Sequence, residues 1–347
     1  RKSTWGATPV IKAQFDYTQD NLGRITDTAK TGEVFNRYGN GTQGLDTFYG
    51  YDDRSQVTSE VTKLGGSSTV LTGRNDAYAW DNIGNRTSLT HNGNTATYTA
   101  NALNQYTQRT VSAFFDVAGA STQSTVTVSK TGGPTDTATR HGNYFFDAYG
   151  LSNTSNPVFA TLAVNDSVTT LNLSAYLAKT PEPSTHDDDG NLTRDGRWVY
   201  QYDAENRLIA QFTRGAADDP LASDSANVAV WNSGVARQKL LFSYDYLGRR
   251  VSKLVANWDS VGSVWQPARS RKFVYDGRNQ MAELDALTTL TLVKSTFWGL
   301  DLSGTLQGAG GVGGLLMVQD GGQTYLPAYD ALGNVHAHIN ASDGSLA

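Results

Sequence analysis

Aromatic and polar positions alternate along most of this chain in a pattern that recurs. The unit reads aromatic, any residue, aromatic, Asp, two residues, Gly or Asn, then Arg and an aliphatic residue. Alternation with a period of two is typical of a strand whose two faces differ, so each copy predicts a strand, a turn and a returning strand. The copies are YGYDDRSQV from Tyr49, YAWDNIGNR from Tyr78, YTANALNQY from Tyr98, YQYDAENRL from Tyr200, FSYDYLGRRV from Phe242, FVYDGRNQM from Phe273, AYDALGNV from Ala328 and a longer first copy, FDYTQDNLGRI, from Phe15.

Each unit contains the residues of a tight hairpin. Aromatics at i and i+2, such as Tyr200 and Tyr202, share one face of a strand and can stack on the pair of the next unit. The following Asp, for example Asp81, can accept hydrogen bonds from backbone amides two residues on, while Gly84 takes positive φ. The residues that we assign to this structural repeat are Tyr49, Tyr51, Asp52, Tyr78, Trp80, Asp81, Gly84, Tyr200, Tyr202, Asp203, Phe242, Tyr244, Asp245, Gly248, Tyr275, Asp276, Tyr329, Asp330 and Gly333.

The spacing of the units predicts how they assemble. Trp80 and Ala100 are 20 residues apart, and Tyr202 and Tyr244 are 42 apart, so one repeat is about 21 residues. A hairpin of that size cannot bury its own face, so the copies should pair edge to edge into a coiled antiparallel sheet, a hollow shell or tube. An ordinary β-sandwich is the alternative, which the repeated turn sequence disfavours.

Residues 111–185 depart from the repeat. They contain short Thr- and Val-rich segments separated by Gly, Asn and Pro, with few charges, which predicts an inserted small β-sandwich. Pro181 and Pro183 mark its exit. We therefore expect a YD-repeat sheet over 1–110, the sandwich over 111–185, and a second YD-repeat sheet over 186–347. The sandwich should pack on the outside of the array and be separable from it.

Composition supports a β protein and narrows the class of partner. The 347 residues include 35 Gly, 17 Tyr and 7 Trp with 18% charged residues, a turn-rich and aromatic-rich mixture. The net charge of -5 argues against a nucleic-acid partner, which would require clustered Lys and Arg. The absence of Cys excludes disulfides and thiolate metal sites. No apolar run reaches the roughly 18 residues of a membrane helix.

These motifs resemble the RHS/YD-repeat family, which includes bacterial polymorphic toxins, shell subunits of insecticidal toxin complexes, and teneurins. The resemblance covers most of the chain. Its most specific part is FWGLDLSGTLQGAGGVGGLL, from Phe297 to Leu316, followed by YLPAYDALGNV from Tyr325, which is similar to the stretch leading into the RHS-associated core. It implies a hollow container for a variable C-terminal effector. The family's self-cleavage string DPxGL does not occur in this sequence, so we expect a fragment that ends before that region.

One glycine-rich string has the spacing of a dinucleotide site. Residues from Gly308 to Gly313 fit GxGxxG, with Asp330 at a distance suitable for a ribose carboxylate. Such a site requires a helix directly after the glycines, whereas the next residues predict a strand, a turn and a proline. We interpret the string as a bend where the sheet passes close to another backbone, and we expect no cofactor.

An acidic cluster, residues 187–189 followed by Gly190, is similar to a calcium loop. Counted from Asp187, however, the required glycine falls on Leu192 and the twelfth position is Trp198 in place of Glu. A turn of the repeat explains the cluster better, with weak surface calcium binding as the alternative. We assign no metal site here.

The histidines and carboxylates form no recognisable catalytic arrangement. His336 and His338 share a strand face and could hold a metal, but no third ligand can be named, so a solvated face is the better interpretation. Five scattered histidines and no cysteine provide no nucleophile with an adjacent base. Every prominent Asp already has a role in a turn. We expect no catalytic residues and no enzyme activity.

Two functions follow from this sequence. The first is a non-enzymatic structural β-shell segment of a protein secreted by, or displayed on, a bacterium, which encloses or presents a C-terminal effector of the same polypeptide. The alternative is an extracellular fibre or surface adhesin whose inserted domain binds a surface glycan or neighbouring copies. Neither function requires a nucleic acid, a cofactor or a membrane span.

Overall fold

The computed structural model describes residues 2–39 and 44–346, and strands dominate them. The prediction of an all-β chain with antiparallel sheets is confirmed. Within the described residues, helix is limited to α1 (Ser225–Trp231) and a 3-10 helix, η1 (Glu33–Tyr38). Neither of these has the length and apolar character that crossing a bilayer as a helix would require.

The first large sheet has ten strands, and nine of them follow one another in sequence order. Each strand is antiparallel to the next, and β9 then pairs with β17 from beyond the inserted segment. The strands are β1 (Lys2–Trp5), β2 (Val10–Gln19), β3 (Ile25–Thr31), β4 (Leu45–Tyr51), β5 (Val57–Leu64), β6 (Val70–Trp80), β7 (Arg86–His91), β8 (Asn94–Ala100), β9 (Tyr106–Arg109) and β17 (Glu182–Pro183).

The second large sheet has twelve strands in strict sequence order. Hairpin connections therefore build the whole sheet, and no strand crosses over another. The strands are β18 (Thr185–His186), β19 (Leu192–Arg194), β20 (Trp198–Tyr202), β21 (Leu208–Thr213), β22 (Gln238–Tyr244), β23 (Arg250–Asp259), β24 (Val264–Asp276), β25 (Asn279–Asp285), β26 (Thr291–Trp298), β27 (Leu315–Asp320), β28 (Gln323–Tyr329) and β29 (Val335–Asn340).

Two small sheets lie between the large ones in sequence and face each other across one core. One has the order β10-β14-β13 and the other β12-β11-β15-β16. Val117 and Tyr149 from the first sheet pack with Val128, Leu162 and Ala175 from the second. The strands are β10 (Phe114–Ala120), β11 (Thr127–Lys130), β12 (Thr135–Thr137), β13 (Thr139–His141), β14 (Tyr144–Gly150), β15 (Val158–Asn165) and β16 (Thr170–Leu177).

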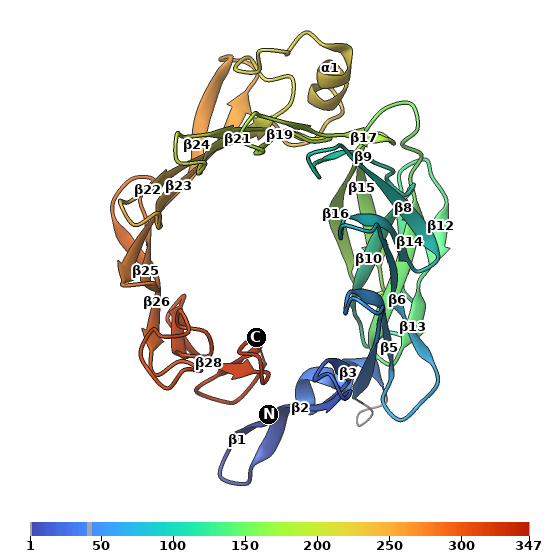
Figure 1. The fold of residues 1–347 in the computed structure, drawn as a ribbon, viewed down its shortest axis with the longest axis vertical. Coiled ribbons are helices and arrows are strands. Elements are labelled where there is room, and N and C mark those ends of the chain that lie inside the picture. The colour runs from blue at the N-terminus through green and yellow to red at the C-terminus, as the bar shows by residue number, and fades with distance from the viewer. Residues whose placement is uncertain (1, 40–43, 347) are drawn as a thin grey trace.

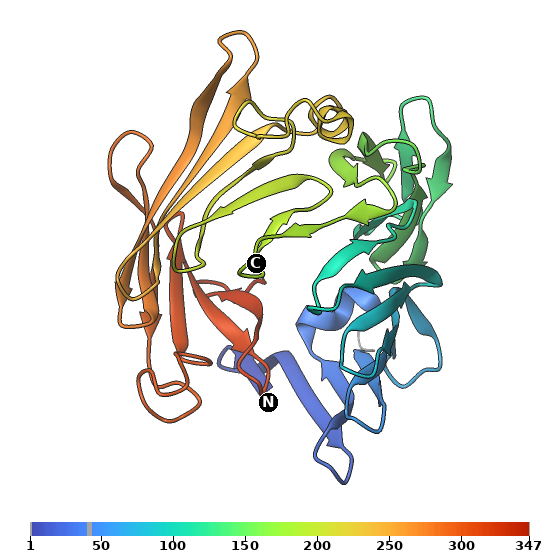
Figure 2. The ribbon, with the colours of Figure 1, turned by 45° about the horizontal axis from the view of Figure 1, so that its top comes forward.

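The two large sheets curve around a central opening, with the first and last strands side by side (Figures 1 and 2). Side-chain contacts join these ends. The ring centroids of Phe15 and His336 are 4.5 Å apart, and the amide of Ala331 donates to the Tyr17 hydroxyl at 3.3 Å. No strand pair of the described residues joins the two ends, so neither large sheet closes on itself.

The small sheets contact the first large sheet through buried side chains as well as through the covalent connections at the two ends of their segment. Tyr144 and Phe146 of β14 are buried in one cluster with Phe15 and Leu71, and the Tyr144 hydroxyl donates to the Thr72 carbonyl at 3.0 Å. The segment is therefore joined to the first sheet by buried side chains as well as by its two ends, and its separability from the array stays a prediction. The segment contributes two aromatic side chains to the core near the meeting point of the chain ends.

Candidate functional site

Most Asp residues of the repeat hold a turn through the carboxylate. Asp81 Oδ1 accepts hydrogen bonds from the amides of Ile83 at 3.0 Å and Asn85 at 2.8 Å, and the Asp81 amide donates to the Asn85 carbonyl at 2.9 Å. The pattern is the side-chain-closed turn that Asp and Asn favour. The same two side-chain bonds occur at Asp20, Asp52, Asn101, Asp203, Asp245 and Asp330.

The third residue after the Asp has positive φ in these turns. Gly248 has φ of 74° and Asn206 has φ of 58°, a region that Gly and Asn enter at lower cost than other residues. A Cβ added to Gly248 would meet no atom within 4 Å. The requirement for Gly at this position is therefore one of backbone conformation and not of space.

Asp276 is an exception among the assigned residues. It is the last residue of β24 and pairs with Asn279, the first residue of β25, so only Gly277 and Arg278 connect the two strands. Gly277 has φ of 55°. This unit therefore has a shorter connection than the turns at Asp203 and Asp245.

In most units the second aromatic is directed back to the preceding hairpin. A β-bulge lies directly before it, for example between Ser243 and Tyr244, and a bulge re-aims a side chain. The Tyr244 hydroxyl donates to the Leu208 carbonyl at 2.7 Å, which joins one unit to the one before it. Equivalent bonds are made by Tyr51, Trp80, Tyr202, Tyr275, Trp298 and Tyr329.

The first aromatics of the units have more varied surroundings. The Tyr200 hydroxyl donates to Asp195 Oδ2 at 2.6 Å. Burial raises the pKa of Tyr49 to about 12, and Tyr78 stacks on Trp80 at 6.3 Å in the same strand. These tyrosines remain protonated at neutral pH and act as hydrogen-bond donors or packing groups.

An arginine links each of several turns forward to the next unit. Arg207 Nε donates to Asp203 Oδ2 at 2.8 Å, its NH1 donates to the Asp245 carbonyl at 3.4 Å, and its guanidinium lies 5.4 Å from the Tyr244 ring centroid. The sequence predicted rings stacked on rings, but here an arginine covers the ring of the next unit. Arg24 and Arg249 make the same kinds of contact.

These contacts stabilise the ionised form of the turn carboxylates. Hydrogen bonds from the amide and side chain of Arg207 lower the pKa of Asp203. The side-chain hydrogen bond from Asn85 lowers the pKa of Asp81. At Asp245, desolvation opposes ionisation, but the bonds from Arg249 outweigh it and lower the pKa. The turn aspartates therefore act as fixed anions in the structure and as hydrogen-bond acceptors.

The glycine-rich string forms a loop around one carboxylate. Asp301 Oδ2 accepts hydrogen bonds from the amides of Ala309 at 2.6 Å and Gly311 at 3.1 Å. The chain then enters strand β27, and Asp330 binds its own turn at Leu332. The backbone donors of this loop are thus directed at a side chain of the same chain.

The other two candidate ligand clusters lie in turns or on the last strand. Asp187 Oδ1 accepts from the Asn191 amide at 2.7 Å, as a turn residue does. His336 Nε2 lies 3.3 Å from Asp330 Oδ2, and the His338 ring lies 6.1 Å from that of Tyr325. The described part of the chain contains no group of three or more His, Cys, Asp or Glu suited to a metal ion.

A histidine connects the first large sheet to the small sheets. His91 Nδ1 lies 2.5 Å from Asp76 Oδ1, and His91 Nε2 lies 3.0 Å from Asp116 Oδ2 in β10. Burial raises the pKa of Asp116, although His91 opposes that change. Both imidazole nitrogens can donate to these carboxylates only when the ring is protonated.

A buried carboxylate marks the passage from the first large sheet to the second. Glu182 of β17 is 8% exposed. Its Oε2 lies 2.5 Å from Arg109 Nε in β9, and its Oε1 accepts from the Gly196 amide at 2.9 Å, directly before β20. One side chain therefore connects both large sheets where the chain leaves the inserted segment.

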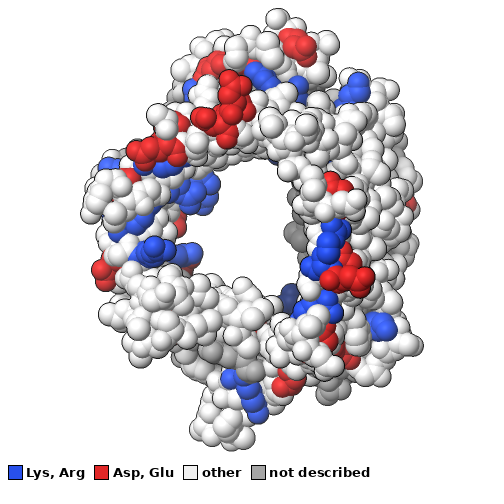
Figure 3. All heavy atoms as spheres, viewed as in Figure 1, with Lys and Arg blue, Asp and Glu red and all other residues white. Residues whose placement is uncertain are grey.

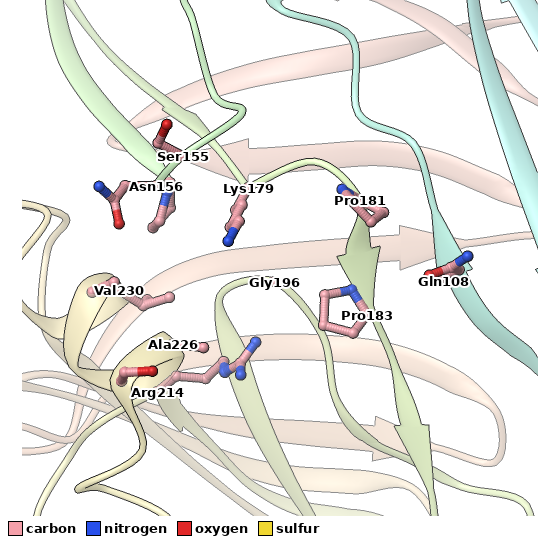
Figure 4. A pocket seen from close by; sticks show the side chains of 13 residues that line it. Gln108, Ser155, Asn156, Lys179, Pro181, Pro183, Gly196, Arg214, Ala226 and Val230 are labelled. Atoms are coloured by element: carbon pink, nitrogen blue, oxygen red, sulfur yellow. The ribbon is translucent and has the colours of Figure 1, made fainter.

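Beside this passage lies a pocket of about 410 Å³, which we call the junction pocket (Figure 4). Its walls come from residues 155–157 of the inserted segment, from its exit linker at 179–183, from Gly196 and Arg214 of the second sheet, and from α1. In Figure 4, Lys179 extends from the linker and Arg214 from the sheet into the same space. Its size is within the range of about 300–1,000 Å³ typical of small-molecule sites.

No motif in the sequence indicates the junction pocket. Lys179 stands in a segment that was interpreted as a linker, and Arg214 follows a strand of the repeat without any motif of its own. The linker lies beside the second sheet because the chain continues from it directly into β18 and because Glu182 accepts a hydrogen bond from the Gly196 amide. A search against protein-family models and a search of curated proteins both found no match to this sequence.

Proposed function

We propose that this chain is a non-enzymatic β-shell segment of a secreted RHS/YD-repeat protein, and that it encloses or presents a C-terminal effector of the same polypeptide. One observation carries the proposal. The central opening remains open when all heavy atoms are drawn (Figure 3), and two sheets of ten and twelve strands form most of its wall. A wall that curves around an opening in this way suits part of a container.

The construction of the wall supports this function. Among the described residues, buried apolar side chains of the twelve-stranded sheet gather in two small groups, one around Phe212 and one at Ala328 and Ile339, where the sheet meets the first strands of the chain. The sheet has no second layer along most of its length, so both of its faces are accessible, one towards the opening and one towards the exterior. Turn carboxylates, arginines and tyrosine hydroxyls join successive hairpins in place of a continuous core.

The position of the last described residues supports presentation of a following segment. In both ribbon views the C-terminus lies at the inner rim of the opening (Figures 1 and 2). Lys and Arg side chains gather along this rim, interspersed with Asp and Glu (Figure 3). A segment that follows the last described residues would start beside the opening and would meet a wall that carries charged side chains.

A protease-protection measurement tests the container. A protease-sensitive reporter peptide is joined after Ala347, and the same peptide is inserted at the exposed turn residue Gly66 as the control. We expect cleavage of the C-terminal reporter to be slower by about tenfold or more, because the wall limits access. Equal cleavage rates in two folded proteins would overturn the proposal.

The second candidate is a fibre or surface adhesin, in which copies associate and the inserted domain binds glycan or neighbouring copies. The unpaired edge of β1 favours it, because β1 has a single strand neighbour, β2. Free backbone groups at a sheet edge can pair with another chain. Sedimentation at increasing protein concentration separates the two candidates: growing assemblies support the fibre, and a constant monomer supports the container.

A further inference from the structure

We propose that the junction pocket binds a saccharide that carries a carboxylate group. The inference takes its ligand class from the chemistry of the pocket walls. It shares with the second candidate function the expectation that this chain binds a glycan. It does not depend on the proposal that the chain is a container. A uronic acid, with one carboxylate on a pyranose ring, is the simplest ligand of this class.

The charges of the pocket favour an anion. The two charged residues among those that line it, Lys179 and Arg214, are both cationic. Within the described residues Lys179 forms no ion pair, and its side chain is exposed to the pocket. A carboxylate placed between the two cations would accept charge-assisted hydrogen bonds from both.

Arg214 is held in position for this role. Its side chain is 8% exposed, its Nε donates to Asn227 Oδ1 at 2.6 Å, and its NH1 donates to the Asp195 carbonyl at 2.7 Å. Neither bond is to a carboxylate, so the charge of the guanidinium is not neutralised by them. A fixed arginine loses little side-chain freedom when it binds a ligand.

The carboxylates near Arg214 are already engaged by other groups. Asp219 binds both terminal nitrogens of Arg194 and accepts from the Gly215 amide at 3.0 Å. Asp195 accepts from the Tyr200 hydroxyl at 2.6 Å. Burial lowers the pKa of Arg214, and the nearby Arg194 acts in the same direction. The negative charges of Asp195 and Asp219 act in the opposite direction, but neither carboxylate accepts a hydrogen bond from Arg214.

The rest of the lining matches a sugar ring better than a simple anion. Pro157, Pro181 and Pro183 present flat apolar surfaces, which suit the C–H faces of a pyranose. Four neutral polar side chains, Gln108, Ser155, Asn156 and Ser225, complete the polar lining. Amides and hydroxyls can both donate and accept, as sugar hydroxyls require. An inorganic anion would use the two cations alone.

Calorimetric titration of the whole chain with glucuronate, glucose and acetate tests the proposal. We expect glucuronate to bind, glucose to bind about tenfold more weakly because it lacks the charged group, and acetate to bind more weakly still because it lacks the ring. Absence of glucuronate binding would overturn the proposal. Acetate binding as tight as that of glucuronate would overturn the saccharide assignment.

Two pairs of variants locate the site. Lys179→Gln should weaken glucuronate binding about tenfold, the effect of losing one charged hydrogen bond, and should leave glucose binding unchanged. Lys272→Gln, at an exposed lysine of the second sheet, should leave both unchanged. Ala226→Trp should fill the pocket and abolish binding, whereas Val228→Trp, on the same helix but outside the lining, should not.

Glucuronate binding that survives both Lys179→Gln and Ala226→Trp would place the ligand elsewhere and overturn the proposal. Circular dichroism of each variant shows whether it folds, and the Lys179 and Val228 variants change side chains at exposed positions. Reporter protection is measured on the parent protein without saccharide. A negative result in one experiment therefore leaves the other proposal standing.

Discussion

The inserted sandwich and the twelve-stranded sheet are both antiparallel, yet different forces hold them. The sandwich buries Val126, Val128 and Leu162 completely between its two sheets. The described part of the longer sheet has two small apolar clusters, one around Phe212 and one that Ala328 and Ile339 share with the first sheet, and its hairpins are joined mainly by Asp-centred turns, arginines and tyrosine hydroxyls. A sheet can thus be stabilised by shared burial, or by short-range polar contacts that are repeated from one hairpin to the next.

This difference has a consequence for sequence. Burial tolerates many apolar side chains of similar volume, so the sandwich needs no motif. A turn such as that at Asp245 requires a side-chain acceptor at its first position and a residue with positive φ at the position of Gly248, and Arg249 adds a side-chain hydrogen bond to the carboxylate. The array therefore shows a recurring sequence pattern, whereas residues 111–185 show only alternation and composition.

We expect the largest loss of stability from a substitution in the core of the sandwich. Leu162→Ala removes a fully buried side chain and should cost about 2–5 kcal/mol of unfolding free energy. Leu171→Ala, at a position that is 64% exposed, is the control and should cost less than about 0.5 kcal/mol. Urea unfolding followed by circular dichroism measures both.

All seven tryptophans lie outside residues 111–185, so their fluorescence follows the large sheets. If the two regions are stabilised separately, Leu162→Ala should shift the circular dichroism transition more than the fluorescence transition. Equal shifts would show that the sandwich and the array unfold as one unit. They would contradict the view that the two regions are stabilised separately.

The next effect is in a turn of the array. Gly248→Val forces a β-branched residue to adopt φ of 74° and should cost about 1–3 kcal/mol. Gly248→Asn should be tolerated, because Asn206 holds the equivalent position with φ of 58°. Tryptophan fluorescence during thermal unfolding gives the measurement. If Val and Asn behaved alike, backbone conformation would not be what selects Gly here.

A smaller effect is expected for the bond between successive hairpins. Tyr244→Phe removes the hydroxyl that donates to the Leu208 carbonyl at 2.7 Å and should cost about 0.5–1.5 kcal/mol. Tyr246→Phe, at a side chain that is 89% exposed, should change stability by a few tenths of a kcal/mol at most. No difference between the variants would assign the role of Tyr244 to packing.

Acid should act in opposite directions on the two regions. The pKa values of Asp203 and Asp245 are lowered in the folded array, so their contribution is complete above the usual value of about 3.9 and is lost as the pH falls below it. Burial raises the pKa of Asp116 and Asp147 in the sandwich, so their protonation favours the folded state. Asp166, whose backbone hydrogen bonds lower its pKa to about 2, offsets part of that gain.

Tryptophan fluorescence and circular dichroism recorded from pH 6 to pH 2 test this difference, with loss of the fluorescence signal expected first. Asp245→Asn is the matched variant, because Asn101 accepts the same two backbone bonds without a charge. It should reduce the acid sensitivity of the array. An unchanged acid midpoint would show that turn ionisation does not control the transition.

The sequence predicted the class of fold and the positions of the turns because both depend on residues close together in the chain. It did not predict the Tyr244–Leu208 bond or the Arg207–Asp245 bond, since these depend on the bulge and on the register of neighbouring hairpins. The junction pocket was missed for a stronger reason. Lys179 and Arg214 stand in separate segments without a motif, and they line one pocket only because the linker, the second sheet and α1 pack together in three dimensions.

The strict order of strands in the large sheets sets the order in which the chain can fold during synthesis. Most strands pair with the strand made just before them, so each hairpin can be added as the chain leaves the ribosome. Glu182, the partner of Arg109, is synthesised 73 residues later. The sandwich between them can therefore form before β17 pairs with β9. Ala331, which donates to the Tyr17 hydroxyl, is synthesised 314 residues after Tyr17. The first and last strands can therefore meet only when translation of residues 1–347 is nearly complete.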